Sequence, residues 1–315
     1  MWHGTFRNGS LRNGTLRNGV RRRALQAALG IALAGLAASS APAEVIAYSF
    51  DTEADDFVEL RLEPGIEPRE TARYPLSPVL SPAPMRLEAR GSTVYWLSPS
   101  PLSFTVLTSM DLAGGEILFQ HVLSVGWLAL ALHPDGTLWM AKDRELYSFD
   151  PADASFSLRA PLPDGDIVRD LAWWQGKLYA LLEGPDPFSD PSLAEIDPTS
   201  GALSNRITLT GSAAGGGLER YPQDIAFDAD GGVWIGMVES SRPWDPHGIV
   251  VHYRDPWTDP TPTVAPWTAA GSQHVMPLAI VGTAGVPDVP TVDRLGAALL
   301  ALLLTAAAIP ALRRR

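Results

Sequence analysis

The chain has no cysteine among its 315 residues. No disulfide bond, thiolate zinc site or cysteine nucleophile is therefore available to it. Charged residues are also scarce, at 19%, whereas 46% of the residues are apolar, a balance typical of a folded protein. The 28 glycines and 28 prolines punctuate short apolar runs, which favours many turns and short strands over long helices.

Basic residues are outnumbered by acidic ones in the body of the chain. Residues 44–286 carry 14 Lys and Arg against 33 Asp and Glu, whereas residues 1–43 carry six Arg and no acid. An acidic body repels phosphate backbones, so nucleic acid is not an expected partner. The sequence also contains no serine nucleophile elbow, phosphate-binding loop or dinucleotide fingerprint.

The N-terminal segment predicts export. A basic stretch ending at Arg23 precedes the apolar run Ala24–Ala38, and the small residues Ala41 and Ala43 follow at the spacing of a cleavage site. We expect residues 1–43 to be a signal peptide that signal peptidase removes. An uncleaved anchor helix is the alternative.

The C-terminal segment predicts a transmembrane helix. Leu295–Leu312 is free of charge and just long enough to cross a bilayer, and Arg313–Arg315 follows it. By the positive-inside rule this end would stay cytoplasmic and the body would lie outside. We therefore divide the chain into residues 1–43, a domain at 44–284, a linker at 285–294 and a membrane segment with a basic tail at 295–315.

This end resembles a known class of sorting signal. Residues 289–296, Val-Pro-Thr-Val-Asp-Arg-Leu-Gly, resemble the IPTL-CTERM motif, Ile-Pro-Thr-Leu-Ser-Glu-Trp-Gly, which is related to PEP-CTERM signals. Pro290, Thr291 and Gly296 match, whereas Asp293, Arg294 and Leu295 depart from the motif. The resemblance implies processing by an exosortase-type enzyme of a Gram-negative bacterium and transfer to the cell surface or extracellular matrix.

The body between the two ends is a repeat. An apolar strand, a tight turn ending in Gly and an aliphatic–aromatic pair recur, with a weaker copy at Met85–Tyr95 and a last single strand at Leu278–Ile280. The clear copies are Leu130–Trp139, Leu171–Tyr179 and Ile225–Trp234. Turns with an apolar residue followed by Asp separate them, as at Phe149-Asp150 and Ile196-Asp197. The spacing indicates units of roughly 40–55 residues, the period of propeller blades.

An all-β propeller is the fold that this repeat predicts. Small residues such as Ala131 and Ala172 suit crowded inner strands, and Trp139, Tyr179 and Trp234 suit the gaps between blades. The strands near Val45–Leu62 would join the strand at Met276–Gly282 in one composite blade that closes the ring. We expect five four-stranded blades, with six as the alternative.

The repeat resembles the broad YVTN/NHL/quinoprotein-like propeller superfamily, in which His-Pro-Asp-Gly and Asp-x-Asp-Gly hairpins are common. His133–Gly136 and Asp228–Gly231 carry these hairpins here. The resemblance covers about residues 45–283 and implies a fold but no single activity.

Two aspartates are the main candidate site. Asp170 and Asp224 both precede an inner-strand Leu-Ala or Ile-Ala pair, so they would meet at the central channel and bind a ligand or cation. Ala129 takes this place in the preceding blade, so the acidic ring would be incomplete. The alternative is that both residues only cap their strands.

Further candidates are metal-binding and aromatic. Asp228 and Asp230 have the alternating spacing of oxygen ligands in a calcium-binding loop, but they also fit a hairpin turn. We expect no other metal or cofactor. Trp244, Trp257 and Trp267 lie in long connections, where they would either contact a ligand or cover the blade edges.

We therefore expect an exported, surface-sorted propeller that binds an unknown surface protein or glycan without catalysis. The alternative is a lactonase-like or quinoprotein-like enzyme that uses acids at the channel. An enzyme needs several polar side chains converging at an open channel mouth, whereas a binding protein needs an exposed aromatic patch.

Overall fold

The computed structural model describes residues 45–51, 54–76, 84–100, 102–183, 189–211, 219–240, 246–267 and 278–281. Regular structure in these residues is entirely β, in twenty strands. No helix in the described part of the chain is long and apolar enough to cross a bilayer. The predicted signal peptide, with Ala41 and Ala43, lies outside the described residues, as do Pro290, Thr291 and the segment Leu295–Leu312.

The strands form five antiparallel four-stranded sheets, which confirms the five-bladed prediction. Blade 1 consists of β20 (Leu278–Val281), β1 (Val45–Asp51), β2 (Asp56–Glu63) and β3 (Ile66–Pro75). Blade 2 consists of β4 (Arg86–Arg90), β5 (Thr93–Ser100), β6 (Phe104–Asp111) and β7 (Glu116–Ser124). Blade 3 consists of β8 (Trp127–Leu132), β9 (Leu138–Lys142), β10 (Glu145–Asp150) and β11 (Ser155–Pro161).

The last two blades follow the same order from the inside outward. Blade 4 consists of β12 (Val168–Trp174), β13 (Lys177–Leu182), β14 (Ser192–Ile196) and β15 (Leu203–Thr208). Blade 5 consists of β16 (Glu219–Phe227), β17 (Val233–Ser240), β18 (Pro246–Tyr253) and β19 (Thr263–Trp267).

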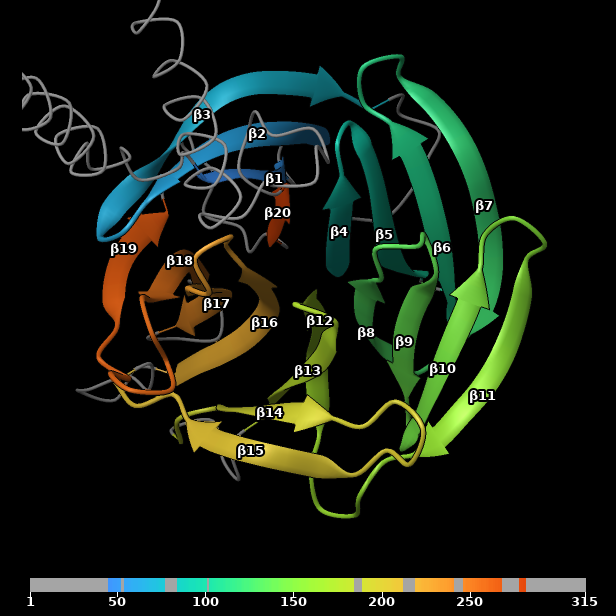
Figure 1. Cartoon of the computed structure of the whole chain (residues 1–315). Helices are drawn as coiled ribbons and strands as arrows, with labels where there is room; N and C mark the ends of the chain where they lie inside the picture. The colour runs from blue at the N-terminus through green and yellow to red at the C-terminus, as the bar shows by residue number, and fades with distance from the viewer. Residues whose placement is uncertain are drawn as a thin grey trace, which may run out of the picture. The chain divides into compact units, whose positions relative to one another are not determined.

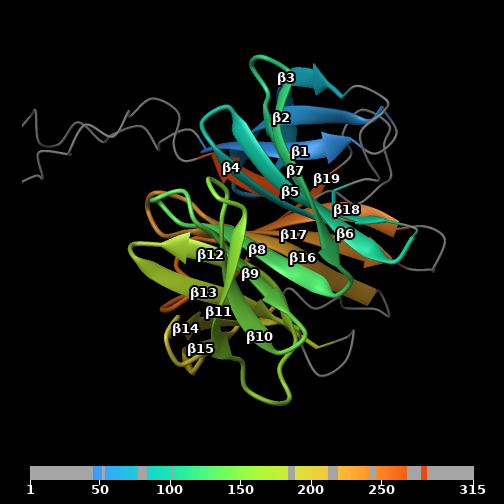
Figure 2. The same cartoon turned by 90° about the vertical axis from the view of Figure 1, so that its right-hand side faces the viewer.

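The blades form a closed ring. Each innermost strand contacts the innermost strand of the next blade, in the order β4, β8, β12, β16, β20 and back to β4. The five strands therefore surround one central axis, with the outer strands at the rim (Figure 1). The side view shows the strong twist of the blades (Figure 2).

The two ends of the domain share blade 1, as the sequence predicts. β20 pairs antiparallel with β1, with Ile46 opposite Val281 and Ser49 opposite Leu278. The pairing joins residues more than 200 positions apart in the chain and closes the ring with backbone hydrogen bonds. The sequence did not predict the long outer strand β3 of this blade.

The tight hairpin turns of the repeat have the expected backbone. Gly136, Gly176 and Gly231 end the turns after β8, β12 and β16, with φ of 99°, 75° and 90°. Glycine adopts this region without a steric cost. At Gly231 a side chain is excluded for a second reason, because a Cβ atom would lie 2.7 Å from the Trp174 ring.

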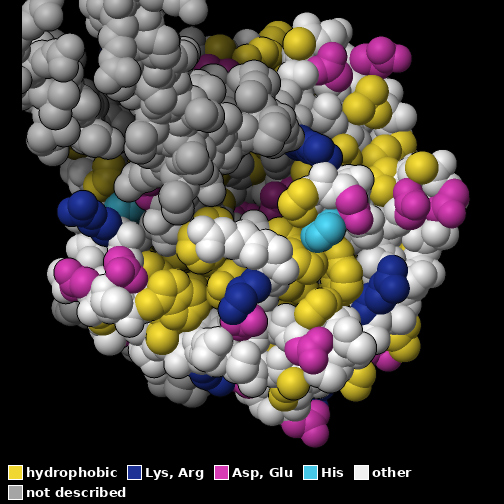
Figure 3. All heavy atoms as spheres, viewed as in Figure 1, with side chains coloured by type: hydrophobic (Ala, Val, Ile, Leu, Met, Phe, Trp, Pro, Cys, Tyr) yellow, Lys and Arg dark blue, Asp and Glu magenta, His cyan; other side chains and the backbone are white. Residues whose placement is uncertain are grey.

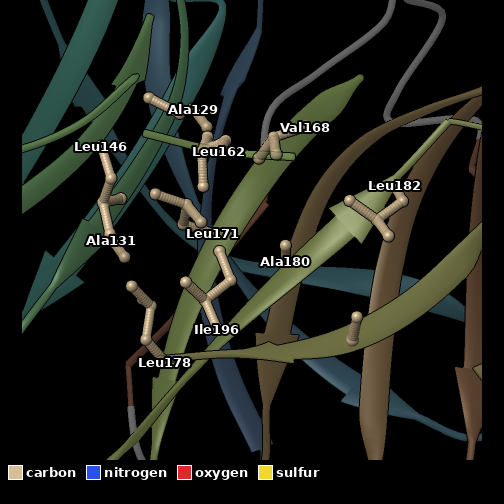
Figure 4. Packing of buried hydrophobic residues seen from close by; sticks show 12 residues of the cluster. Ala129, Ala131, Leu146, Leu162, Val168, Leu171, Leu178, Ala180, Leu182 and Ile196 are labelled. Carbon is tan, nitrogen blue, oxygen red and sulfur yellow. The ribbon is translucent and has the colours of Figure 1, made fainter. Parts of the chain in front are cut away.

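The hydrophobic core is divided among the gaps between blades. Between blades 3 and 4, Ala129, Leu146, Leu171 and Leu178 are buried in one cluster (Figure 4), with Trp139 packed against it. Tyr179 and Trp234 are also buried, so the bulky aromatic residues fill the gaps between blades as predicted. Between blades 2 and 3 aromatic rings pack among aliphatic side chains, and the ring centroids of Phe149 and Phe156, both of blade 3, lie 4.5 Å apart.

Candidate functional site

The central axis collects the polar residues that the sequence predicts there. Paired registers place Arg86, Ala129, Asp170 and Asp224 at equivalent positions of β4, β8, β12 and β16. Asp170 and Asp224 therefore do come together, and Ala129 does interrupt the ring. Arg86 is the residue that the sequence analysis missed, because it lies in the weakest copy of the repeat.

Asp170 holds three blades together through its carboxylate. Its Oδ1 accepts a hydrogen bond from the Leu130 amide at 3.2 Å, and its Oδ2 accepts one from the Ile225 amide at 3.0 Å. Those amides belong to the inner strands of the two neighbouring blades. Burial raises the pKa of Asp170 to about 7, although the charge of Arg86 and the amides act in the opposite direction.

Asp224 is fully buried, and its surroundings offset the cost of burying a carboxylate less well than those of Asp170. Burial, followed by the negative charge of Asp170, raises its pKa well above the usual range. Arg86 and the amides of Leu278 and Leu87 work against this shift. Neither carboxylate oxygen of Asp224 makes a hydrogen bond of ordinary length and angle, so burial favours the neutral, protonated acid over the carboxylate.

Arg86 closes the axis beside the two acids. Only 2% of Arg86 is exposed, and its Nε donates to the carbonyl oxygens of Leu128 at 2.6 Å and Arg169 at 2.8 Å. The same Nε lies 3.9 Å from Asp170 Oδ1. Inner strands are sheet edges whose free carbonyls and amides face the axis, and buried polar groups need partners. Arg86 supplies donors for the carbonyls and Asp170 an acceptor for the amides.

Glu88 is a second channel residue that the sequence analysis missed. It lies on β4 at the position where the other four blades have Ala131, Ala172, Ala226 and Ala279. Burial raises its pKa well above the usual range, and the charges of Asp170 and Asp224 add to the shift, against the amide of Leu132. Glu88 keeps partial exposure, unlike the other charged channel residues.

The two calcium candidates lie in the hairpin between β16 and β17. Asp228 Oδ1 accepts from the amides of Asp230 and Gly232 at 3.0 and 2.8 Å, and Oδ2 accepts from Trp234 Nε1 at 3.0 Å. His252 Nε2 lies 3.5 Å from the same Oδ2. The carboxylate thus orders the turn and the Trp234 ring, and Asp230 is exposed.

The surroundings of Asp228 also determine its charge. Burial would raise the pKa of Asp228, but the contacts from His252, Trp234 and the Gly232 amide together lower it. No group of three or more metal-ligating side chains occurs among the described residues. The calcium site remains a prediction that the geometry does not test.

The structure describes the three candidate tryptophans to different extents. Trp257 is partly buried and packs on Tyr179, with ring centroids 5.7 Å apart, so it covers the edge of a blade. Trp267 ends β19, and its side chain lies outside what the structure describes. Trp244 lies outside the described residues.

A surface of partly exposed aromatic residues lies instead at the ends of the inner hairpins. We call it the aromatic surface; it consists of two groups on opposite faces of blade 4, His133, Trp139 and Trp173 toward blade 3 and Trp174 and Phe227 toward blade 5. Trp173 contacts His133 and Trp139 with centroid distances of 4.5 and 5.6 Å, and Trp174 stacks on Phe227 at 5.2 Å. Figure 3 shows hydrophobic side chains gathered over β8 and β9.

The Trp173-Trp174 pair explains how this surface arises. Successive residues of a strand point to opposite faces, so Trp173 enters the gap toward blade 3 and Trp174 the gap toward blade 5. The sequence analysis identified this hairpin as a repeat unit but did not single out its tryptophans. Two adjacent tryptophans at a hairpin turn were the signal available.

No protein-family model and no curated protein sequence matches the chain. Solved structures match its fold with TM-scores near 0.4. TolB from Acinetobacter baumannii shares 13% identity, with 76% of this chain and 67% of TolB covered and a TM-score of 0.42. A Bacteroides ovatus protein, xyloglucan PUL GH43B, shares 15% identity, with 60% of this chain covered and a TM-score of 0.43.

Regucalcin from Agrobacterium tumefaciens, a calcium-binding protein, shares 18% identity, with 61% of this chain and 77% of regucalcin covered and a TM-score of 0.38. The chain spans 41% of the length of the Bacteroides ovatus protein. These similarities concern the fold alone. The chain has the architecture of a five-bladed β-propeller.

Proposed function

We propose that the chain is an exported propeller displayed at the cell surface, which binds a protein or glycan partner without catalysis. The observation that carries this proposal is the contrast between a closed axis and a partly open aromatic surface. Trp173, Trp174 and Phe227 keep some exposure at the ends of the hairpins, whereas Arg86, Asp170 and Asp224 are at most 2% exposed.

The closed axis argues against a channel enzyme. A catalytic group must reach its substrate within hydrogen-bond distance, directly or through one water molecule. Arg86 and Asp170 are instead buried and bonded to the backbone of other blades. Of Arg86, Glu88, Asp170 and Asp224, Glu88 alone keeps partial exposure, and one acid does not assemble an active site.

A channel enzyme remains the second candidate because of one observation. The pKa of Asp170, raised by burial to about 7, matches what a general base needs at neutral pH. For that role Arg86 would have to move aside to admit a substrate. Hydrolysis of simple lactones that is lost in Asp170→Asn, with the fold intact, would establish this alternative.

The aromatic surface is suited to binding because indole and phenyl rings combine a large apolar face with little side-chain entropy to lose. Aromatic residues are enriched in the cores of protein interfaces, and sugar rings stack on them in the same way. The acidic body, with 33 acids against 14 basic residues over 44–286, favours a neutral or basic partner. We therefore expect neutral glycans or a basic protein face.

The binding proposal is tested by calorimetric titration with surface polysaccharide and surface protein fractions of the native host. Trp173→Ala should weaken binding at least tenfold at a temperature where the variant is still folded, because losing this partly buried ring also lowers the melting temperature. Tyr147→Ala, a partly buried tyrosine in the gap between blades 2 and 3, is the matched control and should bind normally. Unchanged binding by Trp173→Ala would contradict the proposed surface.

Surface display is tested by the intact mass of the protein from membrane, surface and medium fractions of the native host. Removal of residues 1–43 and of the segment beyond about Val289 is the expected result of signal peptidase and an exosortase-type enzyme. A product that still ends at Arg315 would contradict the sorting proposal and leave a membrane-anchored propeller.

A further inference from the structure

The outer strand β7 differs from the outer strands of the other four blades. Among the described strands, none pairs with the outer edge of an outer strand, and proteins usually protect such edges with charges, prolines or short length. β3 contains Glu67, Arg69, Glu70 and Arg73, and β11 and β15 contain Arg159 and Arg206. β19 has only five residues and includes Pro266.

β7 has none of these protections over most of its length. It spans nine residues, and from Ile117 to Ser124 it contains neither a charged residue nor a proline. Leu118 and Val122 project outward with 51% and 66% of their surface exposed. A bulge against the inner neighbour is shared with β3, β11 and β15, so the bulge does not set β7 apart.

The inner face of β7 is already occupied, which leaves its edge and outer face for a partner. Leu123 is buried, and His121 lies 5.5 Å from Phe149 and 5.7 Å from Phe156 between the ring centroids. These contacts fix β7 on blade 3. The strand therefore does not need to rearrange in order to pair, and Figure 1 shows it at the rim of the ring.

We propose that β7 pairs antiparallel with β7 of a second copy of this chain, and so joins two propellers into a dimer with two-fold symmetry. A two-fold axis at Gln120 places Leu118 of each copy opposite Val122 of the other, once on each side of the axis. The apolar residues are thus self-complementary, as a symmetric interface requires.

Charge complementarity favours this occupant over an unrelated extended peptide. The same register places Glu116 of one copy opposite Ser124 of the other. The Ser124 hydroxyl accepts a hydrogen bond from Lys142 Nζ at 2.7 Å, so a lysine stands where the partner's Glu116 would arrive. The symmetry produces this pairing twice, at the two ends of an otherwise uncharged edge. The net negative charge of the rest of the domain opposes other contacts between copies.

The first test is the mass of the purified protein by sedimentation velocity, measured over a roughly hundredfold range of concentration. We expect a monomer–dimer equilibrium. Val122→Lys should raise the dissociation constant at least tenfold, because it brings two lysines into the interface. Leu158→Lys, at a similarly exposed leucine on β11, is the matched control and should dimerise as wild type does.

The second test uses the absence of cysteine in the chain. Gln120→Cys should form a disulfide-linked dimer under mild oxidation, because residue 120 faces its own copy across the axis. Leu158→Cys should remain monomeric on a non-reducing gel. A wild-type protein that stays monomeric at every concentration, or equal cross-linking by both cysteine variants, would overturn the proposal.

Charge-reversal variants test the proposed register of the two β7 strands. Glu116→Lys alone should weaken the dimer, and Glu116→Lys combined with Lys142→Glu should restore it. A dimer that resists Val122→Lys and does not respond to the reversal would place the interface elsewhere on the molecule and overturn the assignment to β7.

Discussion

The axis and the gaps between blades are buried to a similar degree but are filled in opposite ways. Arg86, Asp170 and Asp224 occupy the axis, whereas apolar side chains such as Leu107 and Phe149 fill the gap between blades 2 and 3. Inner strands expose backbone amides and carbonyls toward the axis, and apolar side chains cannot satisfy them. In the gaps the sheets meet face to face, so shape and apolar area decide the packing.

The comparison teaches that buried charge at the centre of a ring is not by itself a sign of catalysis. A buried guanidinium that donates to carbonyls of two blades joins them, as does a carboxylate that accepts from amides of two blades. Such groups are costly to leave without a partner. The axis is therefore the part of the molecule most sensitive to a change of charge.

Arg86→Met should have the largest effect. It removes the donor from the carbonyls of Leu128 and Arg169 and leaves the buried acids without a cation, which we expect to cost about 3–5 kcal/mol of unfolding free energy. Urea denaturation monitored by tryptophan fluorescence measures this loss. Arg90→Met, at the exposed end of the same strand, is the control and should change stability by less than about 0.5 kcal/mol. Equal effects of the two variants would contradict a structural role for Arg86.

The pH dependence of stability should come from the axis. Asp170 binds a proton more tightly when folded, with a pKa of about 7 against 3.8, so its contribution is complete below pH 3.8 and is lost as the pH rises through 7. The raised pKa values of Asp224 and Glu88 act in the same direction. The loss should amount to a few kcal/mol.

Asp170→Asn checks this assignment, because the amide stays neutral and keeps an acceptor for the Leu130 or Ile225 amide. Its unfolding free energy should vary less between pH 4 and pH 8 than that of wild type, when both are measured by urea denaturation. Parallel curves for the two proteins would show that Asp170 does not titrate as described.

Gly232→Ala should have an intermediate effect. A Cβ atom at this position would lie 2.4 Å from Asp228 Oδ2 and 2.7 Å from His252 Nε2, so these two side chains beside Trp234 must shift. We expect a loss of about 1–3 kcal/mol, measured as a lower melting temperature. Gly114→Ala adds a Cβ 3.1 Å from Asp111 on an exposed turn and should cost less. A larger loss from Gly114→Ala would contradict the importance of the Asp228–His252 pair.

Phe149→Leu in the aromatic gap should have the smallest effect, about 1–1.5 kcal/mol. It changes the shape of an apolar contact and no buried charge, so the loss should be the same at every pH between 4 and 8. The variant thus separates the two ways of filling the interior. A loss that varies with pH would mean that the packing is coupled to a titrating group, either in the axis or at His121, whose ring lies 5.5 Å from that of Phe149.

The sequence predicted the ring because the repeat encodes it in each blade separately. The Leu-Ala pairs at Leu130 and Leu171, the turn glycines and the shared blade 1 follow from local pattern and from the order of strands at the two ends. Asp170 and Asp224 could be placed at the axis because equivalent positions of a ring meet there. The depth of their burial could not be predicted from the sequence, because it depends on how closely the inner strands approach one another.

Arg86 and Glu88 escaped prediction for a related reason. They lie in the copy of the repeat that least resembles the others, where a charged residue replaces the small residues that mark an inner strand. The sequence analysis offered the tryptophans of the long connections as ligand contacts or as covers of the blade edges; the structure puts Trp257 against Tyr179, as the second alternative has it, and presents Trp173 and Trp174 at a short hairpin. Local pattern does not show which aromatic side chain a neighbouring blade will cover.

Amide hydrogen exchange measured by NMR tests the closed axis most directly. The account predicts that the amides of Leu130 and Ile225, which donate to Asp170, exchange as slowly as the amides at the centres of the blades, through global unfolding. Fast exchange of these two amides, while their neighbours in β8 and β16 stay protected, would show an axis open to water. That result would contradict the structural role of the buried charges and return the channel to consideration as an active site.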